Sequence, residues 1–389
     1  MQVSGSLDIS GSDPRARSVS EAATSPLHSV LIIQTKFLGD LVLTSALVRN
    51  IRLQFAGARV AILCAEGFEQ FLVSHGIADA TVTLRRARLR GSLPDRAREM
   101  HSVISQLRRF CFDASIDLTD SKTSRVIATL VNAPMRVGYN PSERPLRAWE
   151  WQPHNVFATP FGGGEHFLDR YLSPLQALEA RVLVRLPKID PLLEETATAD
   201  ALLSKHGLQP QGFAVVHAGA SFHGRCWPPE RFAAAMDAIG TTSGLGFLLV
   251  GGPQEKDLAE AVTSSTAARV VNCVGALPLG TLLAVMHRAR LFLGNESGPM
   301  HLAAAAGTPV VGLYGLTDPT CWGPVGVPHI AVRPSQPCDC IAKDLCKWPD
   351  PSRVCCVWRV GVEEVVQAAT ELLGFSAKPE HAPPRHSDA

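Results

Sequence analysis

LFLGNESGPMHLAAAAGTPVVGLYG, residues Leu291–Gly315, has the pattern of a strand, a turn, a helix and a second strand. The first strand is predicted to end at Gly294, and the helix begins near Pro299, because proline is tolerated in a first helical turn. Small alanines let this helix pack close to a sheet, and the next strand is predicted at Val310–Tyr314. This order of elements favours a parallel sheet.

The turn NESG before this helix has two interpretations. Free backbone N–H groups and the positive end of the helix dipole form a natural diphosphate site, to which Ser297 and His301 add side-chain donors. In the alternative, Asn295 and Ser297 only cap the helix. Under the first interpretation the substrate-binding residues are Asn295, Glu296, Ser297, Gly298, Pro299, Met300 and His301.

The same alternation continues on both sides of the quoted stretch. Further strands are predicted at Phe213–His217, Gly246–Val250, Arg269–Asn272 and His329–Val332. Strands with short helical crossovers predict an open, doubly wound, Rossmann-like sheet over residues 188–360. A final helix is predicted over 361–374 and a disordered tail over 375–389.

The first half of the chain shows a second alternation of this kind. Strands are predicted at Ser29–Gln34, Arg59–Cys64 and Ala114–Leu118, and a helix begins at Leu41, where leucines and isoleucine recur every fourth residue. A proline-containing stretch near Lys188 marks the boundary, so residues 27–187 form a first Rossmann-like domain after a disordered leader, 1–26. The fold class is therefore α/β, with a ligand cleft between two domains.

Composition excludes several classes of protein. The 389 residues are 46% hydrophobic, and 37 Lys+Arg against 36 Asp+Glu leave a net charge of +1, which argues against disorder and against nucleic-acid binding. Apolar runs are too short to span a bilayer, and the leader lacks the apolar core of a secretory signal. We therefore expect a cytoplasmic protein.

Two more loops follow strands and precede helices. In HAGASFHGRCWP, Ser221 belongs to a run of small residues that allows close backbone approach, and Arg225 offers a cation to phosphates, although a solvated arginine is the simpler interpretation. In TKFLGD, a single glycine, Gly39, rules out the dinucleotide and Walker fingerprints. Asp40 is either the N-cap of the following helix or a base that faces the cleft, with Lys36 beside it or merely solvated.

These loops resemble those of the family 9 glycosyltransferases, the lipopolysaccharide heptosyltransferases. The resemblance runs from about residue 27 to residue 373. It is carried by KFLGDLVLTSAL, HAGASFHGRCWPPERFA, FLLVGGPQEKD and GNESGPMHLAAAAGTPVVGLYGLTDP. DASIDLTDSKTSR followed by APMRVGY agrees with the usual end of this family's first domain.

The resemblance implies a GT-B fold, with an acceptor-binding first domain and a nucleotide-sugar-binding second domain. It implies inverting transfer of a heptose from ADP-heptose to the lipopolysaccharide inner core, a lipid-linked saccharide, with no cofactor required. Asp40 matches the family's base, Gly298 and Arg225 match positions that hold the diphosphate, and Glu255 matches a carboxylate expected to bind ribose hydroxyls. The family usually has Asp where this chain has Glu296, which leaves a different nucleotide sugar as an alternative.

Several questions stay open at this level. Cys338, Cys340, Cys346, Cys355 and Cys356 either hold a structural zinc ion or are reduced thiols. An arginine run either contacts an anionic membrane or is solvated surface; it comprises Arg85, Arg86, Arg88, Arg90, Arg96, Arg98, Arg108 and Arg109. Two other functions compete with transfer: a nucleotide-sugar-binding protein without activity, and an epimerase, which the missing cofactor fingerprint disfavours.

Overall fold

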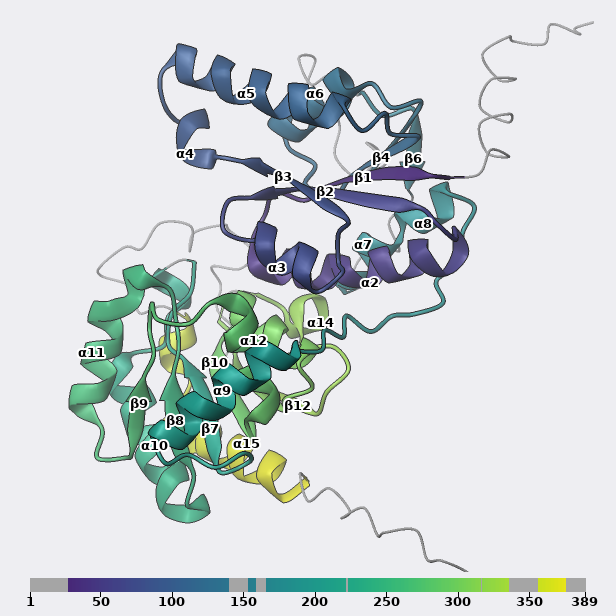
Figure 1. Cartoon of the computed structure of the whole chain (residues 1–389). Helices are drawn as coiled ribbons and strands as arrows, with labels where there is room; N and C mark the ends of the chain where they lie inside the picture. The colour runs from purple at the N-terminus through teal and green to yellow at the C-terminus, as the bar shows by residue number, and fades with distance from the viewer. Residues whose placement is uncertain are drawn as a thin grey trace, which may run out of the picture.

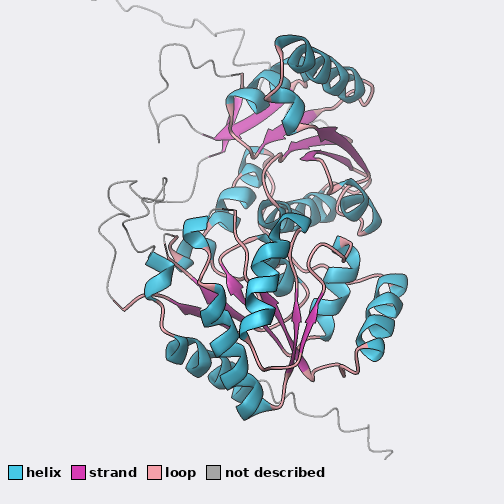
Figure 2. Ribbon diagram, turned by 90° about the vertical axis from the view of Figure 1, so that its left-hand side faces the viewer, coloured by secondary structure: helices cyan, strands magenta, loops and turns pink. Residues whose placement is uncertain are grey.

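The computed structural model describes residues 27–139, 153–158, 166–221, 223–315, 317–335 and 356–375. Two six-stranded parallel sheets form the molecule, with strand orders β3-β2-β1-β4-β5-β6 and β12-β11-β10-β7-β8-β9. Helices cover both faces of each sheet, and the two sheets lie in separate lobes (Figures 1 and 2). The predicted α/β fold with two doubly wound sheets is confirmed.

The first lobe extends from β1 to α8. Its strands are β1 (Ser29–Ile33), β2 (Arg59–Ala65), β3 (Ala80–Leu84), β4 (Ala114–Asp117), β5 (Met135–Tyr139) and β6 (Val156–Ala158). Its helices are α2 (Leu38–Gln54), α3 (Glu69–Ser74), α4 (Arg86–Leu89), α5 (Leu93–Arg108), α6 (Lys122–Val131), α7 (Phe167–Leu172) and α8 (Pro174–Ala177). Residues 178–192, which include Lys188, hold no helix or strand and lead into the second lobe.

The second lobe extends from α9 to α15. Its strands are β7 (Phe213–His217), β8 (Gly246–Leu249), β9 (Val270–Asn272), β10 (Leu291–Asn295), β11 (Val310–Leu313) and β12 (His329–Val332). Its helices are α9 (Leu193–Lys205), η2 (His223–Arg225), α10 (Pro229–Ser243), η3 (Pro253–Glu255), α11 (Lys256–Ser265), α12 (Leu279–Arg288), α13 (Gly298–Ala305), α14 (Pro319–Trp322), η6 (Cys356–Arg359) and α15 (Val362–Phe375).

The predicted start of the first long helix was wrong. The helix begins at Leu38 and not at Leu41, and its N-cap is Phe37, which has no capping side chain of its own. Asp40 is therefore the third helical residue, and its carboxylate reaches back to accept the Phe37 N–H at 3.2 Å. The carboxylate caps the helix from within the first turn, which a search for polar residues before the helix does not detect.

Some predicted segments lie outside the described residues. These are the leader, the tail beyond residue 375, and Cys338, Cys340, Cys346 and Cys355. Cys356 is described and is buried in η6. The predicted C-terminal helix is α15, which buries Val365, Ala369 and Leu372 in the core of the second lobe.

One hydrophobic core crosses from the first lobe to the second. The outer face of the first sheet packs against α5 and α6, and the outer face of the second sheet packs against α10, α11 and α15. The two inner faces belong to a single buried cluster, which includes Ile32 of β1, Leu47 of α2 and Leu302 of α13. Burial of this continuous apolar surface holds the lobes against each other.

The N-terminal turns of α2 and α13 touch where the lobes meet. A β-carbon on Gly298 would lie 2.9 Å from the Leu38 β-carbon and 3.2 Å from the Gly39 nitrogen. A β-carbon on Gly39 would lie 2.7 Å from Cδ2 of His301. Glycine is therefore required on both sides for this approach of the two helices.

We predict that Gly298→Ala destabilises the contact between the lobes, since the added methyl group meets backbone that cannot yield without moving α2. The expected loss is about 1–3 kcal/mol in the free energy of unfolding, the usual cost of overpacking. Chemical denaturation followed by circular dichroism measures it. Gly374→Ala in α15 is the control, because outside the adjoining backbone of its own helix no described atom lies within 4 Å of the added carbon. Equal stability of the two variants would contradict the prediction.

Candidate active site

Asp40 is held from two sides at the start of α2. Only 6% of the residue is exposed. Besides the Phe37 N–H on Oδ2, Oδ1 accepts a hydrogen bond from the hydroxyl of Tyr171 on α7. Burial and the adjacent carboxylate raise the pKa of Tyr171 well above its usual range, so this hydroxyl remains a donor. The carboxylate also lies in a first helical turn, where the helix dipole favours negative charge.

Helix α7 also reaches the second lobe. Phe167 stacks on Trp322 of α14 with ring centroids 3.8 Å apart and planes 21° apart. His166 Nε2 donates to the Gly323 carbonyl at 2.8 Å. Tyr171 follows one turn later on the same helix. Because α7 contacts both Asp40 and α14, the orientation of the carboxylate is coupled to the packing of the two lobes.

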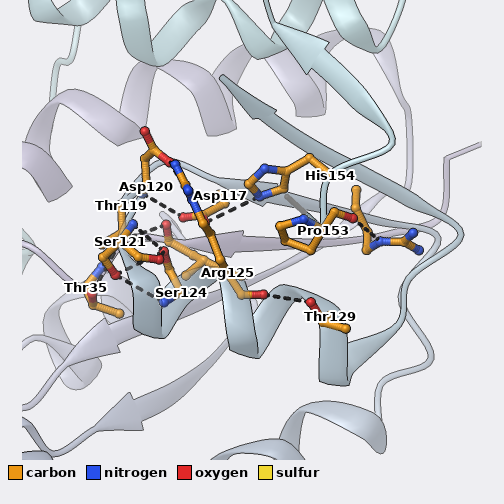
Figure 3. Close-up of polar contacts among 12 residues, drawn as sticks. Thr35, Asp117, Thr119, Asp120, Ser121, Ser124, Arg125, Thr129, Pro153 and His154 are labelled. Carbon is orange, nitrogen blue, oxygen red and sulfur yellow. Dashed lines mark hydrogen bonds and ion pairs between the residues drawn. The ribbon is translucent and has the colours of Figure 1, made fainter. Parts of the chain in front are cut away.

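Charged side chains gather at the carboxyl ends of β1 and β4 in the first lobe (Figure 3). Asp120 accepts from Arg125 at 2.7 Å and lies 3.7 Å from Arg170, whose guanidinium stands 4.2 Å from the Tyr139 ring centroid. Burial lowers the pKa of Lys36, as does Arg170, while Asp40 and other carboxylates act in the opposite direction.

Behind these charges, two buried side chains lie against each other. Asp117 lies 3.5 Å from Nε2 of His154, and its Oδ1 accepts the Asp120 N–H at 3.0 Å. Figure 3 shows this pair next to Asp120 and Arg125. A β-carbon on Gly138 would lie 2.1 Å from the His154 ring, so this glycine makes room for the imidazole. The pair supports the turn that carries Asp120.

Glu296 is a buried carboxylate of the second lobe. Its Oε2 accepts from Arg225 Nη1 at 3.0 Å and from Thr317 Oγ1 at 2.9 Å. Burial raises the pKa of Glu296, and the charge of Asp40 adds to that effect, whereas Arg225 and Thr317 oppose it. The two carboxylates therefore lie within electrostatic range across the lobes, and the guanidinium predicted to face phosphate is held by Glu296.

The loops after β7, β8 and β10 are joined by hydrogen bonds close to Glu296. Asn295 is fully buried and connects two of them, since its amide donates to the Ala218 carbonyl at 2.6 Å and accepts the Trp227 N–H at 3.0 Å. Glu255 and Ser297 both contact His217, at the end of β7. Burial alone would raise the pKa of Glu255, but hydrogen bonds from His217 and from backbone lower it. Glu255 is thus an ionised acceptor.

The first turn of α13 contributes groups of different kinds. Ser297, Gly298 and Pro299 are half-buried, whereas Met300 is fully buried and its sulfur contacts the Tyr314 hydroxyl at 3.4 Å. His301 is 3% exposed, stands against Gly39, and its Nε2 has no hydrogen-bond partner among the described residues. Burial lowers the pKa of His301 to about 3, so the ring is neutral.

Residues 100–348 match the sequence profile of glycosyltransferase family 9 (heptosyltransferase). The chain belongs to glycosyltransferase family 9. A curated relative, lipopolysaccharide heptosyltransferase 3 of Escherichia coli, is 24% identical over 300 residues, which cover 74% of this chain and 84% of the relative. The protein is therefore a glycosyltransferase, as its motifs predicted.

Solved structures agree with the fold. A family 9 glycosyl transferase of Veillonella parvula DSM 2008 has a TM-score of 0.76 at 22% identity and covers 90% of this chain and 98% of its own. The E. coli heptosyltransferase WaaC with ADP has a TM-score of 0.66 at 19% identity and covers 88% and 99%. The two-lobed GT-B arrangement predicted for this family 9 glycosyltransferase is confirmed.

The structure brings most of the predicted site residues of this glycosyltransferase to the junction between the lobes. Asp40, Gly39 and Lys36 come from the first lobe, and the α13 turn comes from the second. Arg225 is joined to this turn by its bond to Glu296, and Glu255 by way of His217 and Ser297. Ser221 is exposed in the loop after β7. Sequence reasoning missed Tyr171, His217 and Thr317. Only His217 carried a usable signal, because it ends a predicted strand on the ligand side of the sheet.

We predict that His301 makes the stability of this glycosyltransferase depend on pH. Its pKa is lowered to about 3 in the folded chain and is about 6.5 when unfolded, so the unfolded state binds more protons at acidic pH. The wild type should lose about 2 kcal/mol through this group between about pH 7.5 and pH 5. Urea denaturation at the two pH values measures the loss.

His301→Asn should show a shallower fall in the free energy of unfolding over this range. The control is His101→Asn, at an exposed histidine of α5, which should keep the wild-type dependence. The same fall in His301→Asn as in the wild type would rule out a neutral buried ring at this position.

Proposed function

We propose that this glycosyltransferase transfers a heptose from ADP-heptose to the inner core of lipopolysaccharide, with inversion at the anomeric carbon. The observation that carries the proposal is the contact between the N-terminal turns of α2 and α13. Through it, Asp40 of one lobe stands beside the anion-binding turn of the other. A base and a leaving-group site on opposite sides of one sugar are what an inverting transfer requires.

The donor is proposed to bind to the second lobe. The backbone N–H groups of Gly298 and His301 and the dipole of α13 attract a diphosphate, and Arg225 adds a guanidinium; Pro299 has no N–H, and that of Met300 donates to the Ser297 carbonyl at 3.2 Å. Ser221 and Ser297 offer hydroxyls from the neighbouring loops. Glu255 accepts from the ribose hydroxyls, which its lowered pKa favours. A relative's structure with ADP, that of WaaC, supports the choice of nucleotide.

The chemistry follows from the placement of Asp40. The acceptor hydroxyl oxygen forms a bond to the anomeric carbon while its proton passes to the Asp40 carboxylate. The bond from that carbon to the diphosphate breaks, and ADP leaves with the electron pair. Charge that develops on the diphosphate is offset by the α13 N–H groups and by Arg225, so the proposed mechanism requires no metal ion. Among the described residues, no three His, Cys, Asp or Glu side chains are grouped to hold one.

The acceptor is proposed to bind to the first lobe. Lys36 and Arg170 lie near the base, and Arg86 of α4 stands 5.2 Å from the exposed ring of Phe37. These cations suit an acidic saccharide on a lipid anchor at the cytoplasmic face of the membrane. In the described part of the chain, no helix has the length and apolar character needed to cross a bilayer.

Contact with an anionic membrane is proposed for the rest of the arginine run. Part of that run is engaged within the protein, since Arg85 and Arg88 lie 3.8 and 3.5 Å from the buried Glu99. Arg108 donates to the Leu130 carbonyl at 2.8 Å. The exposed Arg90, Arg96 and Arg109 are the candidates for lipid head groups.

A donor with a different sugar is the second candidate function. Glu296 stands where the family usually has a shorter aspartate, and its carboxylate is engaged by both Arg225 and Thr317. The longer side chain changes the space available beside the anomeric carbon. Incubation with ADP-heptose and lipopolysaccharide acceptor decides between the candidates: the proposal requires free ADP and a larger acceptor. Release of a nucleoside diphosphate from another sugar nucleotide only, or no turnover with any, would overturn it.

We predict that Asp40→Asn keeps donor affinity and loses about 10²- to 10⁴-fold in kcat, the range typical of a general base. The amide retains the shape of the carboxylate but cannot accept the proton. Steady-state kinetics and calorimetry with ADP measure the two quantities. Asp95→Asn, at a partly exposed aspartate of α5, is the control, and near wild-type kcat in Asp40→Asn would leave Asp40 with only its capping role.

We predict that Arg225→Ala weakens ADP binding by about 10- to 100-fold, the value of a lost hydrogen bond between charged groups. The change removes the cation nearest to the proposed diphosphate site. Isothermal titration calorimetry measures the dissociation constant. Arg231→Ala on α10, whose guanidinium bonds to the backbone of Trp358 and Val360, is the matched control. An unchanged constant in Arg225→Ala would remove this residue from the site.

A further inference from the structure

His217 bridges two loops of the second lobe. It is the last residue of β7 and is 3% exposed. Its Nε2 lies 3.2 Å from Oε2 of Glu255, after β8, and its Nδ1 lies 3.1 Å from Oγ of Ser297, after β10. One buried imidazole therefore joins the carboxylate at the proposed ribose position to the hydroxyl at the start of α13.

The hydrogen bonds around the ring have a definite direction. A carboxylate only accepts, so Nε2 donates to Glu255. The Ser297 hydroxyl lies 3.0 Å from the Asn295 carbonyl, which also only accepts, so the hydroxyl proton points there. Nδ1 then donates to Ser297 Oγ. Three acceptors are thereby each given a donor: the Glu255 carboxylate, Ser297 Oγ and the Asn295 carbonyl.

Backbone features on both sides determine where the Glu255 carboxylate lies. A β-carbon on Gly219 would lie 1.7 Å from Oε1 of Glu255, and one on Gly251 would lie 2.4 Å from Oε2. The Gly252 N–H also donates to Oε2 at 2.7 Å. Two glycines thus leave the space that the carboxylate fills, and the bond from His217 fixes its orientation there.

The other charged groups near the donor loops form a separate set. Arg225 and Thr317 bind Glu296, and none of the three has a hydrogen bond to His217, Glu255 or Ser297 among the described residues. The contacts of His217 with titratable side chains are confined to Glu255 in the part of the chain that the structure describes. The array from Glu255 through His217 to Ser297 is therefore a unit of its own.

We propose that His217 is a positioning residue that holds the ribose-facing and diphosphate-facing groups of the donor site at a fixed spacing, an inference that rests on the proposed function. A nucleoside diphosphate spans both groups. On binding, the diphosphate offers the Ser297 hydroxyl a stronger acceptor than the Asn295 carbonyl, while Nδ1–H keeps Oγ in place. The array thus selects a nucleoside with its diphosphate rather than either part alone.

The test measures coupling between Glu255 and Ser297, which do not bond to each other. The dissociation constant of ADP is determined by calorimetry for Glu255→Gln, Ser297→Ala and the double variant. Each single change is expected to break the array already. In the wild-type background, the fold-loss of ADP affinity in the double variant should therefore be about 3 to 10 times smaller than the product of the two single fold-losses.

The same set is then made with His217→Asn, whose amide nitrogen replaces Nδ1 only, and with His217→Gln, whose amide nitrogen replaces Nε2 only. Neither side chain can contact Glu255 and Ser297 at once. In both backgrounds the fold-loss of ADP affinity in the double variant should therefore equal the product of the two single fold-losses. Two histidine variants are used so that, if the melting temperature of one shows a folding defect, the other still provides the test. His287→Asn, at an exposed histidine of α12, is the control and should keep both affinity and coupling.

The outcomes separate the inference from the proposed function. Wild-type protein that binds no ADP overturns both. ADP binding with independent effects of Glu255→Gln and Ser297→Ala in the wild type overturns the positioning role alone. Coupling that persists in the His217 variants also overturns it, since a purely structural histidine would lower stability and leave the coupling in place.

Discussion

The close approach of two helix N-termini is the constraint on which the rest of the molecule depends. Gly39 and Gly298 leave no room for a β-carbon between α2 and α13, and the buried core continues from one sheet to the other around them. Each helix brings a different chemical group to the same place: a carboxylate in the first turn of α2, and free N–H groups at the start of α13. Neither lobe alone offers both.

Two buried carboxylates near this junction each need partners that offset their negative charge. Asp40 and Glu296 are both buried, and each charge raises the cost of the other. Glu296 is offset by Arg225 and Thr317, whereas Asp40 has the Tyr171 hydroxyl, the Phe37 N–H and the dipole of α2. Tyr171 lies on the helix whose Phe167 stacks on Trp322, so the helix that holds Asp40 also packs against the second lobe.

The sequence predicted what depends on local pattern and missed what depends on distant contacts. The strands of the second sheet follow from apolar runs bounded by glycine and proline, and their predicted bounds differ from the observed ones by a residue at most. The short β3 and β6 of the first sheet lack such runs and were not predicted, and β5 was expected only from the resemblance of APMRVGY to the family. Tyr171 and Asp40 are 131 positions apart, and no local pattern in either segment predicts their contact. Asp40 was predicted at the N-cap position, before the helix. It lies inside the first turn instead, and its carboxylate accepts a hydrogen bond from the N–H of Phe37, three residues earlier.

The central claim is that a donor sugar lies between Asp40 and the first turn of α13. A crystal structure of the wild-type protein with ADP-heptose tests it most directly. We expect the diphosphate on the N–H groups of Gly298 and His301, with the Asp40 carboxylate facing the anomeric carbon from the side opposite the diphosphate. A diphosphate bound away from α13, or a donor whose anomeric carbon is turned away from Asp40, would contradict it.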